Sequence, residues 1–339
     1  MGISFYTLQT VGYLVDTYRG EKAEHNLLDF ALFVGFFPQM VSGPISRGNR
    51  LLPQLSAAKR PAFDDLRDGV LLLIWGYFLK IVVADRAALF VAAVYAPESE
   101  YEGWFYIVAT LLFCLQLYGD FGGCSVMAMG TAKILGIDLI DNFNAPYFSQ
   151  SIAEFWRRWH ISLSTWFRDY LYIPLGGNRK GLKRQIFNLF VVELLTGIWH
   201  GADWNFICWG LYYFVLLALE KLFLLKYLEK GRIWPHIYTM FLVVVGWAMF
   251  VGNEAGVGFG LLFRKLFLPS GGASPVYFLR NYGVLLAVSI LCCTPLIEKL
   301  WNALRKHTVT RVAAVLVLLV LSTAYVVGST NSPFLYFNF

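Results

Sequence analysis

The composition of this 339-residue chain excludes most classes of soluble protein. Hydrophobic residues make up 58% of it, charged residues only 15%, and the mean hydropathy is +0.56. Soluble domains contain about 25% charged residues, so this chain has too few polar side chains to cover a soluble globule of its size. We therefore expect a polytopic membrane protein rather than a soluble enzyme, a disordered segment or a secreted disulfide scaffold.

Charge and cysteine content argue against nucleic-acid binding and against disulfides or a metal site. The formal net charge is +6, but the basic residues stand in short clusters between apolar runs, as they do in loops that flank membrane helices. Nucleic acid is therefore not expected as a partner. The five cysteines are odd in number and form no C-x-x-C pair, which favours buried apolar cysteines over disulfides or a metal site.

Long apolar runs predict the membrane-embedded helices. A spanning helix needs about 20 mostly apolar residues. In chain order the candidate runs are Leu27–Val41, Val70–Val94, Phe105–Leu117, Phe187–His200, Phe206–Leu225, Ile237–Val251, Tyr282–Leu296 and Val312–Val327. Some are short, others contain charges, and the second is long enough to be bent or to form two pieces. We expect about eight to ten embedded helices, some of them tilted or re-entrant.

The stretch from 141 to 181 is rich in aromatic residues but carries too many charges for a lipid-exposed span. Ser151 followed by Glu154 fits a capping box, so a helix is predicted to start at Ser151. Glu154 and Arg158 are four residues apart and are expected to form an ion pair on one face of that helix.

The same helix is predicted to carry an aromatic and polar face. Trp156, His160 and Ser164 recur every four residues and would share it. Pro174 and the turn of Gly176, Gly177 and Asn178 would then end the helix. Such a helix either lies in the headgroup region of the bilayer or enters the protein and lines a polar cavity. The density of Arg and Trp around a central histidine favours the second location.

Two of the five histidines stand in apolar surroundings. His160 lies in the helix just described, and His200 ends an apolar run between Gly197 and Gly201. An ionisable group at membrane depth is costly and therefore a functional candidate. Burial disfavours the charged imidazolium and leaves a neutral base that can accept a proton. The glycines would admit a substrate or another backbone. The alternative is a structural histidine that donates to a backbone carbonyl.

Two weaker patterns carry less weight. Lys80, Asp85 and Arg86 lie in or beside an apolar run, and a buried ion pair there is more often structural than catalytic. The glycines of 256–260 resemble a dinucleotide-binding loop only superficially, because no strand is predicted before them and their spacing is wrong. A flexible connection is the better interpretation of that segment.

Five segments of the chain resemble the membrane-bound O-acyltransferase family, in particular its bacterial branch of alginate O-acetyltransferases and their relatives that transfer D-alanine to teichoic acid. The segments are FFPQMVSGPISR (Phe36–Arg47), GYFLKIVVADR (Gly76–Arg86), NFNAPYFSQSIAEFWRRWHISLSTWFRDYLYIPLGGNR (Asn142–Arg179), WHGADWNFICWG (Trp199–Gly210) and PFLYFNF (Pro333–Phe339). The third is long and distinctive. The resemblance implies one membrane domain over 1–339, an all-α polytopic fold with re-entrant helices around a tunnel or funnel.

The resemblance also implies roles for particular residues. The family's catalytic histidine corresponds to His200, and its second implicated histidine corresponds to His160. A neutral His200 would accept the hydroxyl proton as the hydroxyl attacks an acyl thioester. His160, Ser164 or a backbone N–H would hold substrate or stabilise the oxyanion. Further candidates for substrate binding are Arg157, Arg158, Arg168, Asn144 and Trp199.

The arginines would hold the phosphates of the acyl donor, acetyl-CoA or a carrier-bound thioester. Ion pairing within the helix is an equally good explanation for them. No tightly bound cofactor and no metal are expected.

The chain departs from the family in two respects. Members of this branch usually have extra membrane helices before the position of Met1, so this chain is expected to lack them. The family often shows D-F-S-G-[YC]-[ST]-D, whereas this chain reads DFGGCSV from Asp120 to Val126. No role of the final aspartate can therefore be transferred to it.

The favoured function is O-acyl transfer, most often of acetyl, from a cytoplasmic thioester to a cell-surface or exported polysaccharide, directly or through a secreted SGNH-type acetyltransferase. The expected location is the bacterial plasma membrane, with multiple passes through the lipid bilayer. D-alanyl transfer to teichoic acid stays open. Two further alternatives are a proton-coupled transporter in which both histidines relay protons and a non-catalytic export platform.

Overall fold

The computed structural model describes residues 3–40, 42–96, 99, 101–201, 203–254, 264–265 and 275–328. The predicted connection at 256–260 and the ending at 333–339 lie outside these ranges. All regular elements within them are helical, which confirms the predicted all-α class. The α-helices are α1 Ile3–Tyr18, α2 Leu27–Val34, α3 Gly48–Ala57, α4 Phe63–Tyr77, α5 Asp85–Tyr95, α6 Trp104–Leu117, α7 Gly123–Ile134, α8 Ile152–Arg158, α9 Ile161–Phe167, α10 Gly181–His200, α11 Trp204–Leu219, α12 Leu225–Leu228, α13 Trp234–Glu254, α15 Pro275–Cys292, α16 Pro295–Leu304 and α17 Thr308–Val327.

Short tighter or wider helical turns join several of these helices. The turns η1 Phe37–Gln39 and η4 Pro146–Phe148 are 3₁₀ turns. The π-helical turns are η2 Phe78–Ala84, η3 Tyr118–Gly122, η5 Arg168–Tyr172 and η6 Glu220–Leu224. Each π turn continues directly into or out of an α-helix, so the helix axis carries on where the hydrogen-bond pattern widens.

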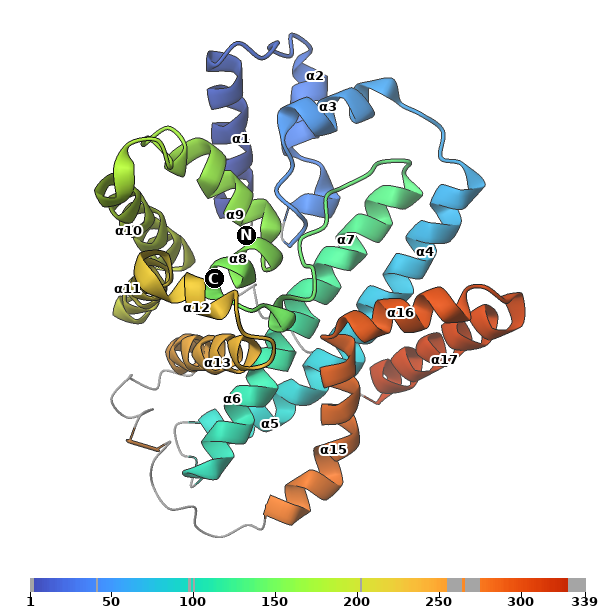
Figure 1. Cartoon of the computed structure of the whole chain (residues 1–339). Coiled ribbons are helices and arrows are strands. Elements are labelled where there is room, and N and C mark those ends of the chain that lie inside the picture. The colour runs from blue at the N-terminus through green and yellow to red at the C-terminus, as the bar shows by residue number, and fades with distance from the viewer. Residues whose placement is uncertain are drawn as a thin grey trace.

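The longest rod of the fold consists of α6, η3 and α7, which run without a break from Trp104 to Ile134 (Figure 1). Its 31 residues correspond to about 46 Å at 1.5 Å per residue, more than the hydrocarbon thickness of about 30 Å. The predicted run ended at Leu117, where the continuous apolar stretch stops. The structure continues through Asp120 and the glycines after it because their polar and small side chains face a neighbouring helix.

That neighbour is α4, which runs beside α7 (Figure 1) and approaches it closely through glycines. A Cβ atom on Gly76 would lie 2.7 Å from the carbonyl oxygen of Gly123. Seven residues after Gly123 on α7, a Cβ atom on Gly130 would lie 2.8 Å from the carbonyl oxygen of Gly69. Since no larger side chain fits at these contacts, the glycines set the distance between the two backbones. The π turn η2 joins α4 directly to α5 within the run Val70–Val94, which was predicted to be bent or to form two pieces.

Four helical stretches of the described chain are long and apolar enough to cross a membrane: Trp104–Ile134, Trp204–Leu228, Trp234–Val251 and Thr308–Val327. A fifth candidate is the pair Arg280–Cys292 and Pro295–Leu304, which bends by 83°. This bend agrees with the predicted broken or re-entrant helices. Fewer helices reach spanning length than the about eight to ten embedded helices expected, because helices such as α2 are short.

The run predicted as a span over Leu27–Val41 forms only the eight-residue α2, which ends at Val34. Gly35 caps it, and Pro38 starts the 3₁₀ turn η1. A proline cannot continue an α-helix with intact hydrogen bonds, which explains why the apolar run is longer than the helix.

The main core is aromatic and lies where α5, α6, α8, α11 and α13 meet. Its largest buried side chains include Phe105, Phe113, Phe155, Trp209 and Tyr213. At the other extreme, only 6% of the apolar window of α17 is buried. Helix α17 therefore presents most of its surface to lipid, and the aromatic core surrounds the segment that carries the predicted histidines.

Candidate functional site

The segment before His160 folds as predicted. The Oγ atom of Ser151 accepts a hydrogen bond of 3.0 Å from the backbone N–H of Glu154, and α8 begins directly after this cap. Glu154 forms the predicted ion pair with Arg158 at 2.7 Å. The sequence rule for helix starts therefore places the first element of the site correctly.

The predicted continuous helix through His160 is wrong. Helix α8 ends at Arg158, Trp159 is extended, and His160 adopts a left-handed conformation with φ 45° and ψ 53° before α9 begins at Ile161. Trp156, His160 and Ser164 therefore do not share one helix face. A non-glycine residue in this region is strained and persists only where the surroundings compensate.

Asn142 provides that compensation. Its Oδ1 atom accepts hydrogen bonds from the N–H of Ser162 at 3.1 Å and from the Ser162 hydroxyl at 2.9 Å. The same oxygen lies 3.2 Å from Nδ1 of His160, which donates to it because an amide oxygen only accepts. Nε2 of the neutral ring is then unprotonated. It is buried, and within the described part of the chain it has no hydrogen-bond partner.

His200 is fixed by a similar device. It is the last residue of α10, and its Nδ1 atom lies 2.8 Å from the carbonyl oxygen of Thr196. A carbonyl can only accept, so Nδ1 carries the proton and Nε2 carries the lone pair of the neutral ring. Aromatic rings surround it, with centroids 4.9 Å away for Trp199, 5.0 Å for Trp209 and 5.7 Å for Phe250.

The indole of Trp199 brings the two histidines together. Its ring centroid lies 6.1 Å from that of His160 and 4.9 Å from that of His200. Phe5 of α1 packs against both His160 and Trp199. Its ring centroid lies 6.3 Å from that of His160 and 5.7 Å from that of Trp199. Three residues predicted from the sequence, 40 positions apart at the extremes, thus form one contiguous site with two imidazoles that can each accept a proton at Nε2.

Protein atoms fill the space beside the two glycines near His200. A Cβ atom on Gly197 would lie 2.5 Å from the backbone oxygen of Phe206, and one on Gly201 would lie 2.6 Å from the Phe206 ring. The start of α11 therefore occupies the space that these glycines leave, which is the second of the two occupants expected for them.

Ser164 lies beside His160 through the backbone. Its N–H donates to the carbonyl oxygen of His160 at 3.0 Å, and its hydroxyl donates weakly to that of Trp159 at 3.4 Å. Trp199 forms the wall between the histidines described above. Asn144 is exposed, and its carbonyl oxygen accepts from Arg158 at 3.4 Å.

The three predicted arginines lie at the surface around α8 and α9 rather than against the imidazoles. Arg158 is held by Glu154, Arg168 is held by Asp169 at 2.7 Å, and Arg157 is exposed. No hydrogen bond of the described residues links any of them to His160 or His200. Ion pairing, the alternative explanation of these arginines, is therefore observed for two of the three. In the described ranges no cluster of three or more His, Cys, Asp or Glu side chains is suited to a metal ion.

Two further groups support the site and were not predicted. Glu220 of η6 accepts hydrogen bonds from the N–H groups of Ile152 at 2.7 Å and Ala153 at 3.0 Å, so a buried carboxylate caps the start of α8. Asn142 holds His160 as described above. Glu220 stands out in the sequence as a charge within an apolar run, whereas the polar stretch around Asn142 gives no comparable signal.

Comparisons with known proteins match this architecture to one family. The model of the membrane-bound O-acyltransferase family matches residues 3–255. A probable alginate O-acetylase of Pseudomonas putida is 43% identical over 253 residues, which cover 74% of this chain and 52% of that protein.

Two other relatives act on different acceptors. A peptidoglycan O-acetyltransferase of Helicobacter pylori is 36% identical over 65% of this chain and 47% of its own length. A teichoic acid D-alanyltransferase of Bacillus subtilis is 30% identical over 75% of this chain and 69% of its own length. The chain spans about half the length of the alginate O-acetylases it matches.

Proposed function

Because the chain belongs to the membrane-bound O-acyltransferase family, we propose that it moves an acetyl group from a thioester donor to a hydroxyl group of a cell-surface or exported polysaccharide. The transfer is direct or passes through a secreted SGNH-type acetyltransferase. The observation that carries this proposal is the orientation of His200, whose Nδ1–H is held by Thr196 and whose Nε2 is left as a base.

The reaction follows from that orientation. As the hydroxyl oxygen attacks the thioester carbonyl, Nε2 of His200 accepts the hydroxyl proton. A C–O bond forms, the C–S bond breaks, and the proton passes on to the departing thiolate. General-base assistance of this kind contributes about 10²–10⁴-fold to the rate. The aromatic surroundings keep water away from the reacting thioester.

His160 takes the second role. With its Nδ1–H directed to Asn142, its Nε2 accepts rather than donates a hydrogen bond. We therefore assign His160 to accepting a hydrogen bond from a neighbouring hydroxyl group of the acceptor, since the single proton of the attacking hydroxyl goes to His200, rather than to stabilising the oxyanion. The hydrogen-bond donor that stabilises the oxyanion then has to be Ser164 or a backbone N–H group.

The donor side of the proposal rests on the arginines. Arg157 is exposed, and Arg158 and Arg168 form ion pairs with carboxylates at the surface. Phosphates of acetyl-CoA or of a carrier-bound thioester would compete with those carboxylates for the guanidinium groups. We place this face of the molecule on the cytoplasmic side of a bacterial plasma membrane.

Acetyl rather than D-alanyl transfer is proposed because the acetylating relatives are more similar. Identity is 43% to the alginate O-acetylase and 30% to the D-alanyltransferase. Supplying labelled acetyl and D-alanyl donors to the same membranes separates the two, since only one label should reach the polysaccharide.

Replacing His200 tests the proposal directly. His200→Ala should lower the O-acyl content of the surface polysaccharide by about 10²-fold or more, with the amount of membrane-inserted protein unchanged. The control is His307→Ala, because His307 is exposed at the start of α17 and should leave acylation intact. Normal acylation in His200→Ala would refute the catalytic assignment and favour an export platform. Transport of polysaccharide without any acyl donor would favour a transporter.

A further inference from the structure

A buried cluster of charges joins the two π turns η2 and η3. The ammonium group of Lys80 lies 2.5 Å from Asp85 and 2.7 Å from Asp120. Asp120 is 1% exposed, and the side chains of Lys80 and Asp85 are 13% and 17% exposed. The sequence predicted the pairing of Lys80 with Asp85 but not the contact with Asp120, which lies on another helix. Arg86, also predicted in this cluster, instead lies 4.6 Å over the ring of Tyr325.

The backbones at this cluster are in close contact. A Cβ atom on Gly119 would lie 3.0 Å from the carbonyl oxygen of Leu79, and one on Gly123 would lie 3.1 Å from the N–H nitrogen of Lys80. A buried charge pair is a weak source of net stability, but in some proteins it fixes the register of the elements that it joins. The ion pair of Lys80 with Asp120 links η2 to η3 at this contact.

Phe121, the residue after Asp120, connects this contact with His160. The ring of Phe121 is fully buried and meets the ring of His160 edge-on, with centroids 4.7 Å apart. It also meets Phe143 at 5.0 Å, and Phe143 meets Trp159 at 5.0 Å. Turn η3 thus contributes an aromatic ring that packs directly against His160.

We propose that Lys80, through its ion pair with Asp120, positions Phe121 against His160 and so holds the His160 imidazole in its working orientation. This inference rests on the proposed acyl transfer. His160 has a strained backbone, and on its ring only Nδ1 has a hydrogen-bond partner among the described residues. The orientation of its free Nε2 therefore depends on the aromatic rings that surround it. A shift of about 1 Å at a reacting group can reduce the rate by about 10²-fold.

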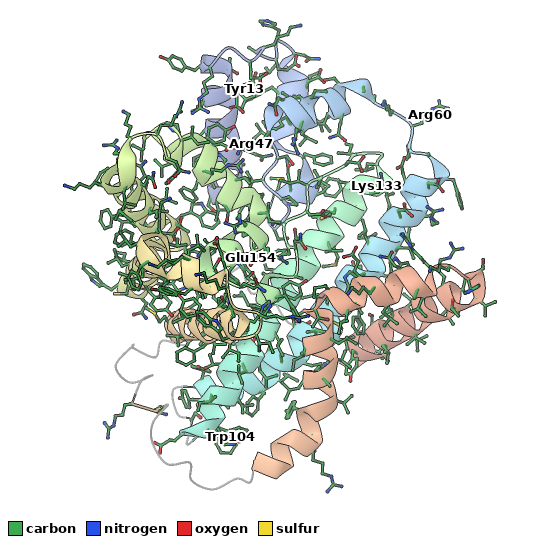
Figure 2. The ribbon with its side chains drawn as sticks, viewed as in Figure 1. Tyr13, Arg47, Arg60, Trp104, Lys133 and Glu154 are labelled. Carbon is green, nitrogen blue, oxygen red and sulfur yellow. The ribbon has the colours of Figure 1, made fainter. Side chains whose placement is uncertain are left out.

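The variants are chosen so that none leaves an unpaired buried charge. Lys80→Met combined with Asp85→Asn and Asp120→Asn removes the whole cluster, because removing Lys80 alone would strand two carboxylates. Phe121→Leu removes the last link without changing any charge. Lys80→Arg keeps the charge and should preserve activity. The matched control is Lys133→Met, since Lys133 also links two aspartates, at 2.9 Å to Asp65 and 2.7 Å to Asp138, at the far end of α7 (Figure 2).

The kinetic measurement uses the complete 339-residue chain in lipid nanodiscs with acetyl-CoA and a polysaccharide acceptor. The triple variant and Phe121→Leu should each lower kcat by about 10-fold to 100-fold with the KM for acetyl-CoA unchanged. Combining them should cost no more than the larger single effect, because both act through one contact. Multiplied losses, or an unchanged kcat in the triple variant, would overturn the proposal.

A second measurement does not depend on activity. Diethyl pyrocarbonate modifies accessible histidines, and peptide mass spectrometry reports each one. His160 should be protected relative to the exposed His307 in the unaltered protein and in Lys133→Met, and it should react in the triple variant and in Phe121→Leu. Protection of His160 that survives in both would refute the positioning role. Absence of acyl transfer in the unaltered protein would refute the proposed function, while this labelling would still decide whether Lys80 positions His160.

Discussion

At the scale of single residues, the site depends on hydrogen bonds that fix which nitrogen of each imidazole is free. Thr196 does this for His200 through a bond within one helix turn, since the two residues are four apart. Asn142 does it for His160 across 18 positions of sequence. The first bond lies within the last turn of α10 and is therefore local in the sequence. The second bond depends on the left-handed backbone conformation of His160, which no local sequence pattern predicts.

Asn142→Ala should destabilise the protein through this residue. It removes the acceptor of two buried Ser162 donors and of His160, at a cost of about 1–3 kcal/mol of unfolding free energy for the groups left unpaired. Thermal unfolding of the purified protein in detergent measures the loss as a lower midpoint. Asn144→Ala is the matched control, because the Asn144 side chain is exposed and forms no hydrogen bond in the described structure. Equal midpoints for the two variants would contradict the role of Asn142.

At the scale of elements, small residues decide which helices approach each other. Gly197 of α10 faces the backbone of α11, where a Cβ atom would lie 2.5 Å from the carbonyl oxygen of Phe206. From the other side, a Cβ atom on Gly210 would lie 2.4 Å from the carbonyl oxygen of Glu193. This contact places His200, at the end of α10, against Trp209 of α11. In the sequence these glycines were evident, but the partner that each of them faces was not.

Gly197→Ala should therefore disturb the site through the helix pair. The added methyl group meets backbone that cannot rotate away, and overpacking of this kind costs about 1–3 kcal/mol. Gly283→Ala in α15 is the control, because nothing lies within 4 Å of a Cβ atom there, and alanine is the better helix former. Thermal unfolding should show a lower midpoint for the first variant and an equal or higher midpoint for the second. The opposite order would contradict the close packing of α10 and α11.

Element boundaries were predictable where a local signal acts alone. Ser151 starts α8 as its capping pattern predicts, and the turn at 176–178 ends the segment after η5. The prediction was wrong where a distant partner satisfies a polar residue. Asp120 lies just beyond the predicted run, which stops at Leu117, yet Lys80 forms an ion pair with it and the rod continues to Ile134.

At the scale of the whole molecule, the arrangement separates an aromatic interior from helices that face lipid. Helix α17 lies at the edge of the fold (Figure 1), with Val317 55% and Leu316 53% exposed. The apolar side of α17 that faces away from α4 and η2 is exposed among the described residues and suits a bilayer. The bent pair α15–α16 leads into it, and α17 packs against α4 and η2.

A lysine at the middle of α17 should impair membrane integration. Val317→Lys places a charge near the centre of the span, where it costs about 2.5–3.5 kcal/mol on insertion scales. Val309→Lys is the matched control, since Val309 lies in the first turn of α17 and a lysine there can extend to the interface. The fraction of protein resistant to alkaline extraction from membranes should fall for Val317→Lys and stay unchanged for Val309→Lys. Equal fractions would contradict the lipid-facing assignment of α17.

The sequence by itself determined the membrane class, the all-helical fold, the start of α8 and the two histidines at the site, because hydropathy, helix caps and isolated ionisable residues are properties of short segments. Only the tertiary structure decided that the helix breaks at His160, that Asn142 sets the free nitrogen of that residue, and that Lys80 reaches Asp120 on another helix. The two contacts join residues that are 18 and 40 positions apart in the sequence. The free energy of burying a polar group depends on the partner that meets it, and a partner brought in by folding leaves no mark in the local sequence.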